Sequence, residues 1–332
     1  MKTYILFFVF ILGMFSCSVP YSESDQQTNQ TPVLIQESQI DQCIAVDVSY
    51  DPLSIVQTAY TNLFSGDLEG FLDTLSDDVE WIHYGPPGTI PTYGVYYGKQ
   101  GVTEWAYNLF SCVQMNYFDI HYFVVDGNIV HSQVKEGAFS YGAGTQMYIE
   151  NFHSFVFNPD GKISKVCILS ESYTGVTAYN GENGLTYSTP YENNDYQSTY
   201  ETTRIDKLKV YKLLFDMQKN GKKNINMFSD DAQIVMTGPE DIVPYMGKFS
   251  GYDEIRNFMK KFSKDIRCID IKYIVKMGNK VNVCLKLYGK SSRSRTSYQS
   301  EAVFSFQYDD TGKIARLYGY SDNYTISRSY IE

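Results

Sequence analysis

One stretch of the sequence occurs twice, and this repeat limits the folds that the chain can adopt. The first copy covers residues 76–109 and the second covers residues 229–262, and both begin with Ser-Asp-Asp. A Gly-Pro pair and then a Gly-Lys pair follow in the same order in both copies. A repeat of this length indicates a duplicated domain rather than a solenoid.

The remainder of each copy repeats as well. Turns and strand ends recur at a constant separation, which pairs Gly127-Asn128 with Gly278-Asn279, Gly161-Lys162 with Gly312-Lys313, and Tyr173-Thr174 with Tyr324-Thr325. In each copy, apolar residues at helical spacing come first and alternating strand patterns follow. This order predicts an α+β fold with a bent, mostly antiparallel sheet in each copy. The predicted domains are residues 49–175 and 204–330, joined by a Ser-, Tyr- and Asn-rich linker over 176–203.

The N-terminus has the pattern of a targeting segment. An apolar run from Tyr4 to Leu12 follows Lys2 and is too short to anchor stably in a bilayer. Ser16-Cys17 then resembles the lipobox of bacterial lipoproteins, although Met14 departs from the usual Leu. We therefore expect residues 1–17 to be a signal peptide with Cys17 as the lipidated residue, and 18–48 to be a flexible tether. The resemblance implies a lipid-anchored protein of the bacterial cell envelope; a plain secretory signal, giving a secreted or periplasmic protein, is the alternative.

Composition narrows the class of partner. The net charge is −10, with 38 acidic and 28 basic residues, and no basic stripe runs between the aromatic residues. A nucleic-acid partner is therefore not expected. The 30 Tyr and 20 Phe residues favour aromatic cores or pockets, so a small apolar or aromatic molecule is the expected partner.

Cysteine spacing gives no sign of a metal site. The five cysteines beyond the signal segment are odd in number and form no Cys-x-x-Cys pair: Cys43, Cys112, Cys167, Cys268 and Cys284. No metal or other cofactor is expected. Export would permit disulfides, but Cys112 and Cys167 have no cysteine at the matching position of the second copy, so buried free thiols are the default expectation.

The order of motifs in the first copy resembles a known family. This order consists of a helix, Gly66-Asp67-Leu68, Asp77-Asp78-Val79-Glu80-Trp81, a Gly-Pro loop and Tyr97-Gly98-Lys99. It resembles that of the SnoaL-like polyketide cyclases and ketosteroid isomerases. These belong to the nuclear transport factor 2-like superfamily. The resemblance implies two tandem cone-shaped α+β barrel domains, each a strongly bent sheet wrapped around N-terminal helices with a pocket between them. It does not settle the activity, because this fold carries isomerases, cyclases, dehydratases and binding proteins.

The resemblance also places the isomerase positions on this sequence. The general-base position is occupied by His83 in the first copy and Met236 in the second. The second acid position is occupied by His153 and Phe304. Tyr60 lies next to the position of the oxyanion Tyr. The isomerase residues themselves are therefore absent.

Strand alternation groups the candidate site residues. Trp81 and His83 share one face of a strand, and Asn151, His153 and Phe155 share one face of another. In a cone these faces converge, so the first copy is expected to hold two imidazoles in an aromatic pocket. The matching faces of the second copy carry Met236, Phe304 and Phe306, which can only line an apolar pocket. His121 and His131 are expected to face solvent.

Two classes of function remain open from the sequence. One is a binding protein for a small apolar ligand, or a scaffold at the cell envelope. The other is a cofactor-independent isomerase, cyclase or dehydratase that works only in the first domain, with His83 as base and His153 as acid or hydrogen-bond donor. The two domains could pack as an intramolecular pseudo-dimer, or the chain could form a homodimer.

Overall fold

The computed structural model describes residues 48–181, 198, 205, 207–219 and 225–332. The predicted signal peptide, Cys17 and nearly all of the tether lie outside these residues, as does most of the predicted linker. Among the described helices, none is long and apolar enough to cross a membrane.

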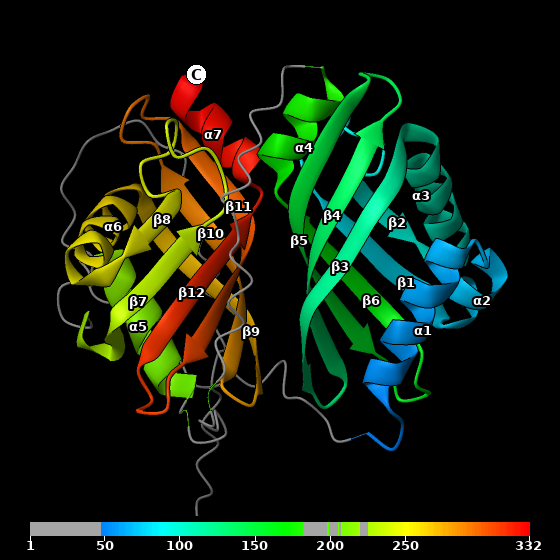
Figure 1. The fold of residues 1–332 in the computed structure, drawn as a ribbon, viewed down its shortest axis with the longest axis horizontal. Helices are drawn as coiled ribbons and strands as arrows, with labels where there is room; N and C mark the ends of the chain where they lie inside the picture. Colours follow the sequence, from blue (N-terminus) through cyan, green and yellow to red (C-terminus); the bar gives the residue numbers. More distant parts are fainter. Residues whose placement is uncertain (1–47, 182–197, 199–204, 206, 220–224) are drawn as a thin grey trace, which may run out of the picture.

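The first unit packs three helices against a sheet of six strands, whose order is β2-β1-β6-β5-β4-β3. Only β1 and β6 pair in parallel; the other neighbours are antiparallel. A fourth helix follows the last strand (Figure 1). The elements are α1 (Pro52–Ser65), α2 (Leu68–Asp73), β1 (Leu75–Tyr84), β2 (Gly94–Tyr97), α3 (Gly98–Cys112), β3 (Val113–Asp126), β4 (Ile129–Ser140), β5 (Thr145–Phe157), β6 (Ile163–Ser170) and α4 (Ser172–Tyr179).

The second unit repeats this topology with the strand order β8-β7-β12-β11-β10-β9. The prediction of two α+β units, each with a mostly antiparallel sheet, is confirmed. The elements are α5 (Lys207–Lys219), a short 3₁₀ helix (Ile225–Met227), β7 (Phe228–Met236), β8 (Gly247–Ser250), α6 (Gly251–Asp265), β9 (Ile266–Met277), β10 (Lys280–Lys290), β11 (Ser297–Tyr308), β12 (Ile314–Ser321) and α7 (Asn323–Ile331).

Helix α1 has clear start and stop signals in the sequence. The Asp51 side chain accepts hydrogen bonds from the backbone N–H groups of Leu53 (3.1 Å) and Ser54 (3.3 Å). Gly66 ends the helix in the left-handed region with φ +82°. Between these ends, Val56, Ala59 and Leu63 form the buried stripe, which turns the neighbouring Tyr60 towards the interior of the cone.

Helix α4 extends into the predicted linker. It ends at Tyr179, and Val176 and Ala178 are almost fully buried. Val176 packs with Ile90 and Tyr93, whereas Ala178 packs with Val113, Ala138 and Met147. The prediction missed this turn because two apolar residues among polar ones give no clear periodicity.

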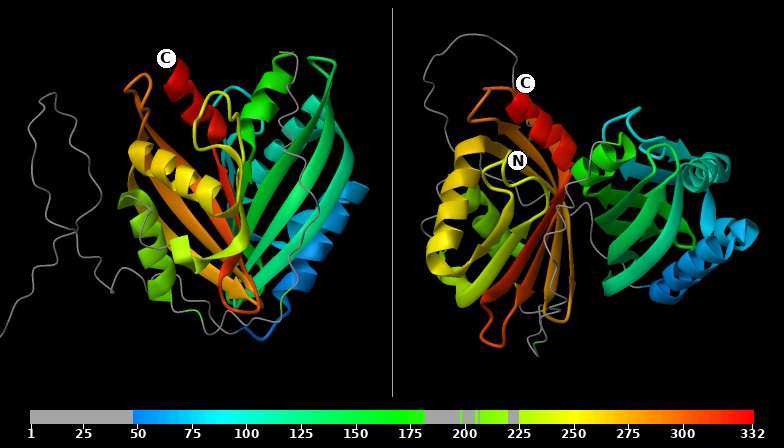
Figure 2. Two further views of the ribbon diagram at one scale, coloured as in Figure 1. Left: turned by 60° about the vertical axis from the view of Figure 1, so that its left-hand side comes forward. Right: turned by 45° about the horizontal axis from the view of Figure 1, so that its top comes forward.

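The two sheets pack against each other, with α1–α3 and α5–α6 on their outer sides (Figures 1 and 2). An apolar cluster between the sheets joins strands of both units: Phe152, Leu169, Val235, Cys284, Val303, Tyr318 and Tyr320. His131 also lies here, with none of its surface exposed, and its ring is 5.0 Å from that of Phe152. The expectation that His131 faces solvent is therefore wrong, because the second unit covers that face. His121 is half-buried.

Two polar contacts across the interface form a matching pair. The Tyr122 hydroxyl lies 2.8 Å from the Ser305 hydroxyl, and the Tyr273 hydroxyl lies 2.7 Å from that of Ser154. Tyr122 and Tyr273 occupy the same position in the two copies, as do Ser154 and Ser305. The contact therefore has the reciprocal form of a twofold interface within a single chain. The four described cysteines, Cys112, Cys167, Cys268 and Cys284, are free thiols.

Candidate functional site

A pocket lies inside the cone of the first unit, between α1, α3 and the inner face of the sheet. The empty space in and around it, which includes solvent at its opening, amounts to about 550 Å³. Most of its wall is apolar or aromatic, and the polar groups are few: Tyr60, His83, Glu136, Asn151 and His153.

Strand register brings the two histidines into one row across the sheet. His83 of β1 is paired with Ile168 of β6, Ile168 with His153 of β5, and His153 with Ser132 of β4. Two strand spacings separate the backbones of His83 and His153, which amounts to about 10 Å. Because side chains alternate between the two faces of each strand, this register places His83, His153 and Ser132 in one polar strip on the concave face of the sheet.

Both ring nitrogens of His83 are engaged. The Trp105 indole N–H donates to Nδ1 at 3.4 Å, so Nδ1 is the acceptor and a neutral ring carries its proton on Nε2. That Nε2–H then donates to the Ser170 hydroxyl, 2.8 Å away. This tautomer cannot accept the Ser170 proton, so the Ser–His pair is not an activated nucleophile.

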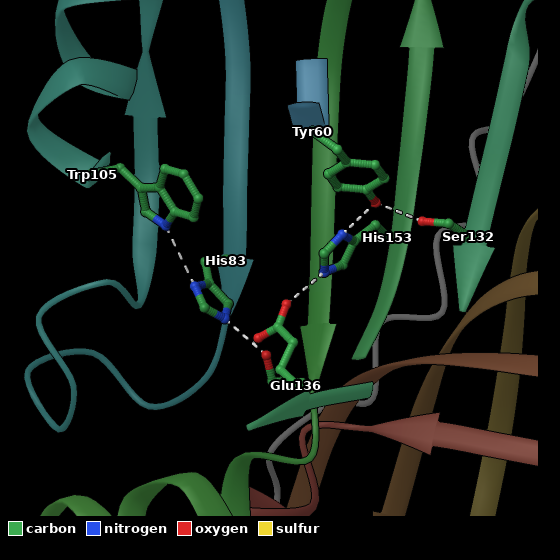
Figure 3. A network of polar contacts seen from close by, with 7 residues as sticks. Tyr60, His83, Trp105, Ser132, Glu136 and His153 are labelled. Atoms are coloured by element: carbon green, nitrogen blue, oxygen red, sulfur yellow. Dashed lines mark hydrogen bonds and ion pairs between the residues drawn. The ribbon is translucent and has the colours of Figure 1, made fainter. Parts of the chain in front are cut away.

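His153 has one engaged nitrogen and one open nitrogen. Its Nδ1 lies 2.7 Å from the Tyr60 hydroxyl, which lies 2.7 Å from the Ser132 hydroxyl. Its Nε2 points towards the Glu136 carboxyl, with 3.7 Å between Nε2 and Oε1 (Figure 3). This separation is too long for a hydrogen bond. Tyr60 therefore fixes the ring while Nε2 remains open towards the pocket.

Burial controls the charges in this pocket. Desolvation raises the pKa of Glu136 to about 7, against a smaller opposing effect of its hydrogen bond with Asn151. Desolvation lowers the pKa of His153 and that of His83 to about 3, and for His83 the neighbouring His153 adds to the effect. Both imidazoles are therefore neutral at pH 7, and Glu136 and His153 are not a salt bridge despite their proximity.

Three polar atoms in the pocket wall have no hydrogen-bond partner within the described residues. They are Trp81 Nε1, Asn151 Oδ1 and His153 Nε2. Their side chains are buried, with residue exposures of 3%, 1% and 5%. An unpaired buried polar group typically costs about 1–3 kcal/mol. Three such atoms on the wall of one pocket indicate a place where a ligand or water supplies the missing partners.

The second unit has the same cone but no such polar strip. Met236, Phe304 and Phe306 are at most 1% exposed and belong to its hydrophobic core rather than to the wall of this pocket. The repeat also replaces the remaining polar side chains of the strip by apolar ones: Ser132 by Val283, Glu136 by Leu287 and Asn151 by Ala302. The second cone is filled by its own side chains at the positions where the first is polar.

The structure brings together all six first-unit residues that the sequence singled out: Tyr60, Trp81, His83, Asn151, His153 and Phe155 line the pocket. Sequence reasoning missed Glu136, Ser132 and Trp105. A signal for two of them was present, because Val130, Ser132, Val134 and Glu136 alternate along β4. The inward-facing Val130 would have placed Ser132 and Glu136 on the same inner face. Within the described residues, no group of three His, Cys, Asp or Glu side chains could hold a metal ion.

Comparison with protein families identifies the first unit. Residues 56–166 match the family model described as a SnoaL-like domain. This portion of the chain is therefore a SnoaL-like domain, as the motif order predicts. The second unit has the same strand order. A comparison with the curated proteins gave no match.

Several solved structures are similar to part of this chain. One is a nuclear transport factor 2-like protein from Burkholderia xenovorans LB400, 18% identical, with a TM-score of 0.36, over 39% of this chain and 95% of that one. Another, from Burkholderia thailandensis E264, is 15% identical, with a TM-score of 0.36, over 39% and 97%. TerC, crystallised with polyporic acid, is 20% identical, with a TM-score of 0.36, over 39% and 98%.

Proposed function

We propose that the first unit binds a small, largely apolar molecule through one polar group, and that the second unit is its fixed structural partner. The observation that carries this proposal is the set of three unpartnered polar atoms in an otherwise apolar pocket. Apolar walls supply binding free energy, and a few placed polar groups fix the orientation of a ligand. The absence of a corresponding polar strip in the second unit supports the division of roles.

In this proposal the chain is exported and held at the bacterial cell envelope by a lipid on Cys17. The apolar run from Tyr4 to Leu12 and the small residue Ser16 before Cys17 support this part. Residues 18–48 would then act as a tether between the lipid and the first unit.

Binding is tested with Asn151→Ala. We expect a ligand of the wild-type protein to raise its melting temperature, because binding to the native state stabilises it by mass action. Loss of the Asn151 side chain removes the open acceptor Oδ1, so affinity should fall about tenfold. Thermal shift and ligand-detected NMR against a panel of small aromatic compounds would measure this. Asn257→Ala is the matched control, because Asn257 is exposed on α6. No binding by the wild type across the panel would instead favour the envelope scaffold.

Proton transfer is the second candidate function, and Glu136 favours it. A general base works best when its pKa is near the operating pH, and the pKa of Glu136 is raised to about 7. The geometry gives the base role to Glu136 rather than His83, because both nitrogens of His83 are engaged. The open Nε2 of His153 could then hydrogen-bond the developing oxyanion.

Exchange of ligand C–H protons with deuterated water tests this candidate. We expect the bound ligand to lose its exchangeable C–H signal in NMR spectra with the wild type and to keep it with Glu136→Gln, because the amide cannot accept the proton. Equal exchange rates for the two proteins would exclude Glu136 as the base. Binding without exchange by either protein would leave a binding function.

A further inference from the structure

We propose that the ligand of the first unit is an organic cation: a protonated amine attached to a small apolar or aromatic group. This inference rests on the proposed binding function and adds the chemical class of the ligand. It is carried by the combination of a buried carboxyl, an aromatic wall and an open acceptor in the same pocket.

The carboxyl of Glu136 has no cationic partner among the described residues. His153, the nearest group that could be charged, is neutral because burial lowers its pKa. Lys135 is the adjacent residue, but its Nζ lies 3.9 Å from Oε1 of Glu150. No lysine or arginine lines the pocket. An unpaired buried carboxylate is costly, and a cationic ligand would remove much of that cost by pairing with it.

The pocket wall suits a positive charge. Seven aromatic side chains other than the imidazoles line it: Tyr60, Phe64, Phe71, Trp81, Trp105, Phe118 and Phe155. The rings are close to one another, with centroids 4.5 Å apart for Trp81 and Trp105 and 5.6 Å apart for Tyr60 and Phe155. Aromatic faces attract cations, and more strongly where water is excluded.

Two acceptor groups in the pocket also match an ammonium group. Asn151 Oδ1 can only accept a hydrogen bond, and the ionised Glu136 carboxylate can only accept as well. An ammonium N–H group is the complementary donor. A carboxylate or phosphate ligand would meet Glu136 and Asn151 Oδ1 without a cation to balance its charge. Glu136 and Asn151 Oδ1 therefore disfavour an anionic group beside them.

Three compounds that share one ring and differ in charge test the inference on the full chain: benzylamine, benzyl alcohol and benzoate. At pH 7.5 these are a cation, a neutral molecule and an anion. Titrations followed by NMR should show benzylamine binding the wild type at least tenfold more tightly than benzyl alcohol, with benzoate weakest. In Glu136→Gln the preference for the amine over the alcohol should fall to less than about threefold.

Glu104→Gln is the matched control, because Glu104 is exposed on α3 and should leave the selectivity unchanged. Benzyl alcohol binding as tightly as benzylamine, or an amine preference that survives in Glu136→Gln, would overturn the inference and leave the binding function intact. A failure of all three compounds to bind would count against the inference and the proposed function together. Melting temperatures of the variants confirm that each is folded.

Discussion

The variant Phe152→Ala is expected to lose about 3–5 kcal/mol of the free energy of unfolding, in line with the usual cost of removing a buried phenylalanine ring. Phe152 is 1% exposed and lies on the outer face of β5, opposite the pocket. Its ring centroid lies 5.9 Å from that of Tyr320 in the second unit. The substitution therefore leaves a cavity between the two sheets. Since domains are typically stable by only 5–15 kcal/mol, this loss is large.

Two spectroscopic signals can distinguish unfolding of the first unit from unfolding of the whole chain. Both tryptophans of the chain, Trp81 and Trp105, lie in the first unit, so tryptophan fluorescence follows that unit alone. Far-ultraviolet circular dichroism follows both units. In urea we expect Phe152→Ala to lower the midpoint of both signals, because the second unit loses the same contacts. Phe110→Ala is the control, since Phe110 is 41% exposed and should change stability by about 0.5 kcal/mol or less.

Independent unfolding of the two units would contradict this prediction. If Phe152→Ala lowered the midpoint of the fluorescence signal but left a later transition in circular dichroism at its wild-type position, the sheets would touch without stabilising each other. The paired contacts of Tyr122 with Ser305 and of Tyr273 with Ser154 would then be too weak to couple the units.

The fold was predictable because local signals agreed in both copies. Gly127 and Gly278 end matching strands with φ of +55° and +53°, a conformation that glycine adopts at little cost. Gly161 and Gly312 lie in the turns before β6 and β12 and adopt the same conformation, with φ of +76° and +79°. Such turns fix the register of the hairpins that they connect. Two copies with the same turn positions therefore predict the same sheet twice.

The site was predictable only where it depends on alternation along a strand. Alternation placed His83 and His153 on inner faces, but it gives no information on what covers the opposite face. His131 was assigned to solvent for that reason, whereas the second unit buries it. The tautomer of His83 depends on Trp105, which is 22 positions away on α3. Such a contact depends on tertiary packing and has no local sequence signal.

The stability of Glu136→Leu should exceed that of the wild type by an amount that grows with pH. Leu is the residue at this position in the second unit, Leu287, which is fully buried in its core. Burial raises the pKa of Glu136 from 4.5 to about 7, so between these values the native state holds a proton that the unfolded state has released. Wild-type stability therefore falls as pH rises from about 4.5 to 7, and the full cost, up to about 3 kcal/mol, persists above pH 7.

Urea unfolding at pH 5 and pH 8 measures this difference for the wild type, Glu136→Leu and Glu136→Gln. Neither variant has a titratable group at this position. The free energy of unfolding of each variant, relative to the wild type, should therefore be higher at pH 8 than at pH 5. Only the Leu variant also buries additional apolar surface. A stability difference that does not change with pH would mean that Glu136 is not held in its protonated form by burial. Glu136→Leu should also abolish ligand binding. The Glu136 carboxyl would then lower the stability of the first unit and yet be retained, because it binds the ligand. Such a trade-off between stability and function is common at functional sites.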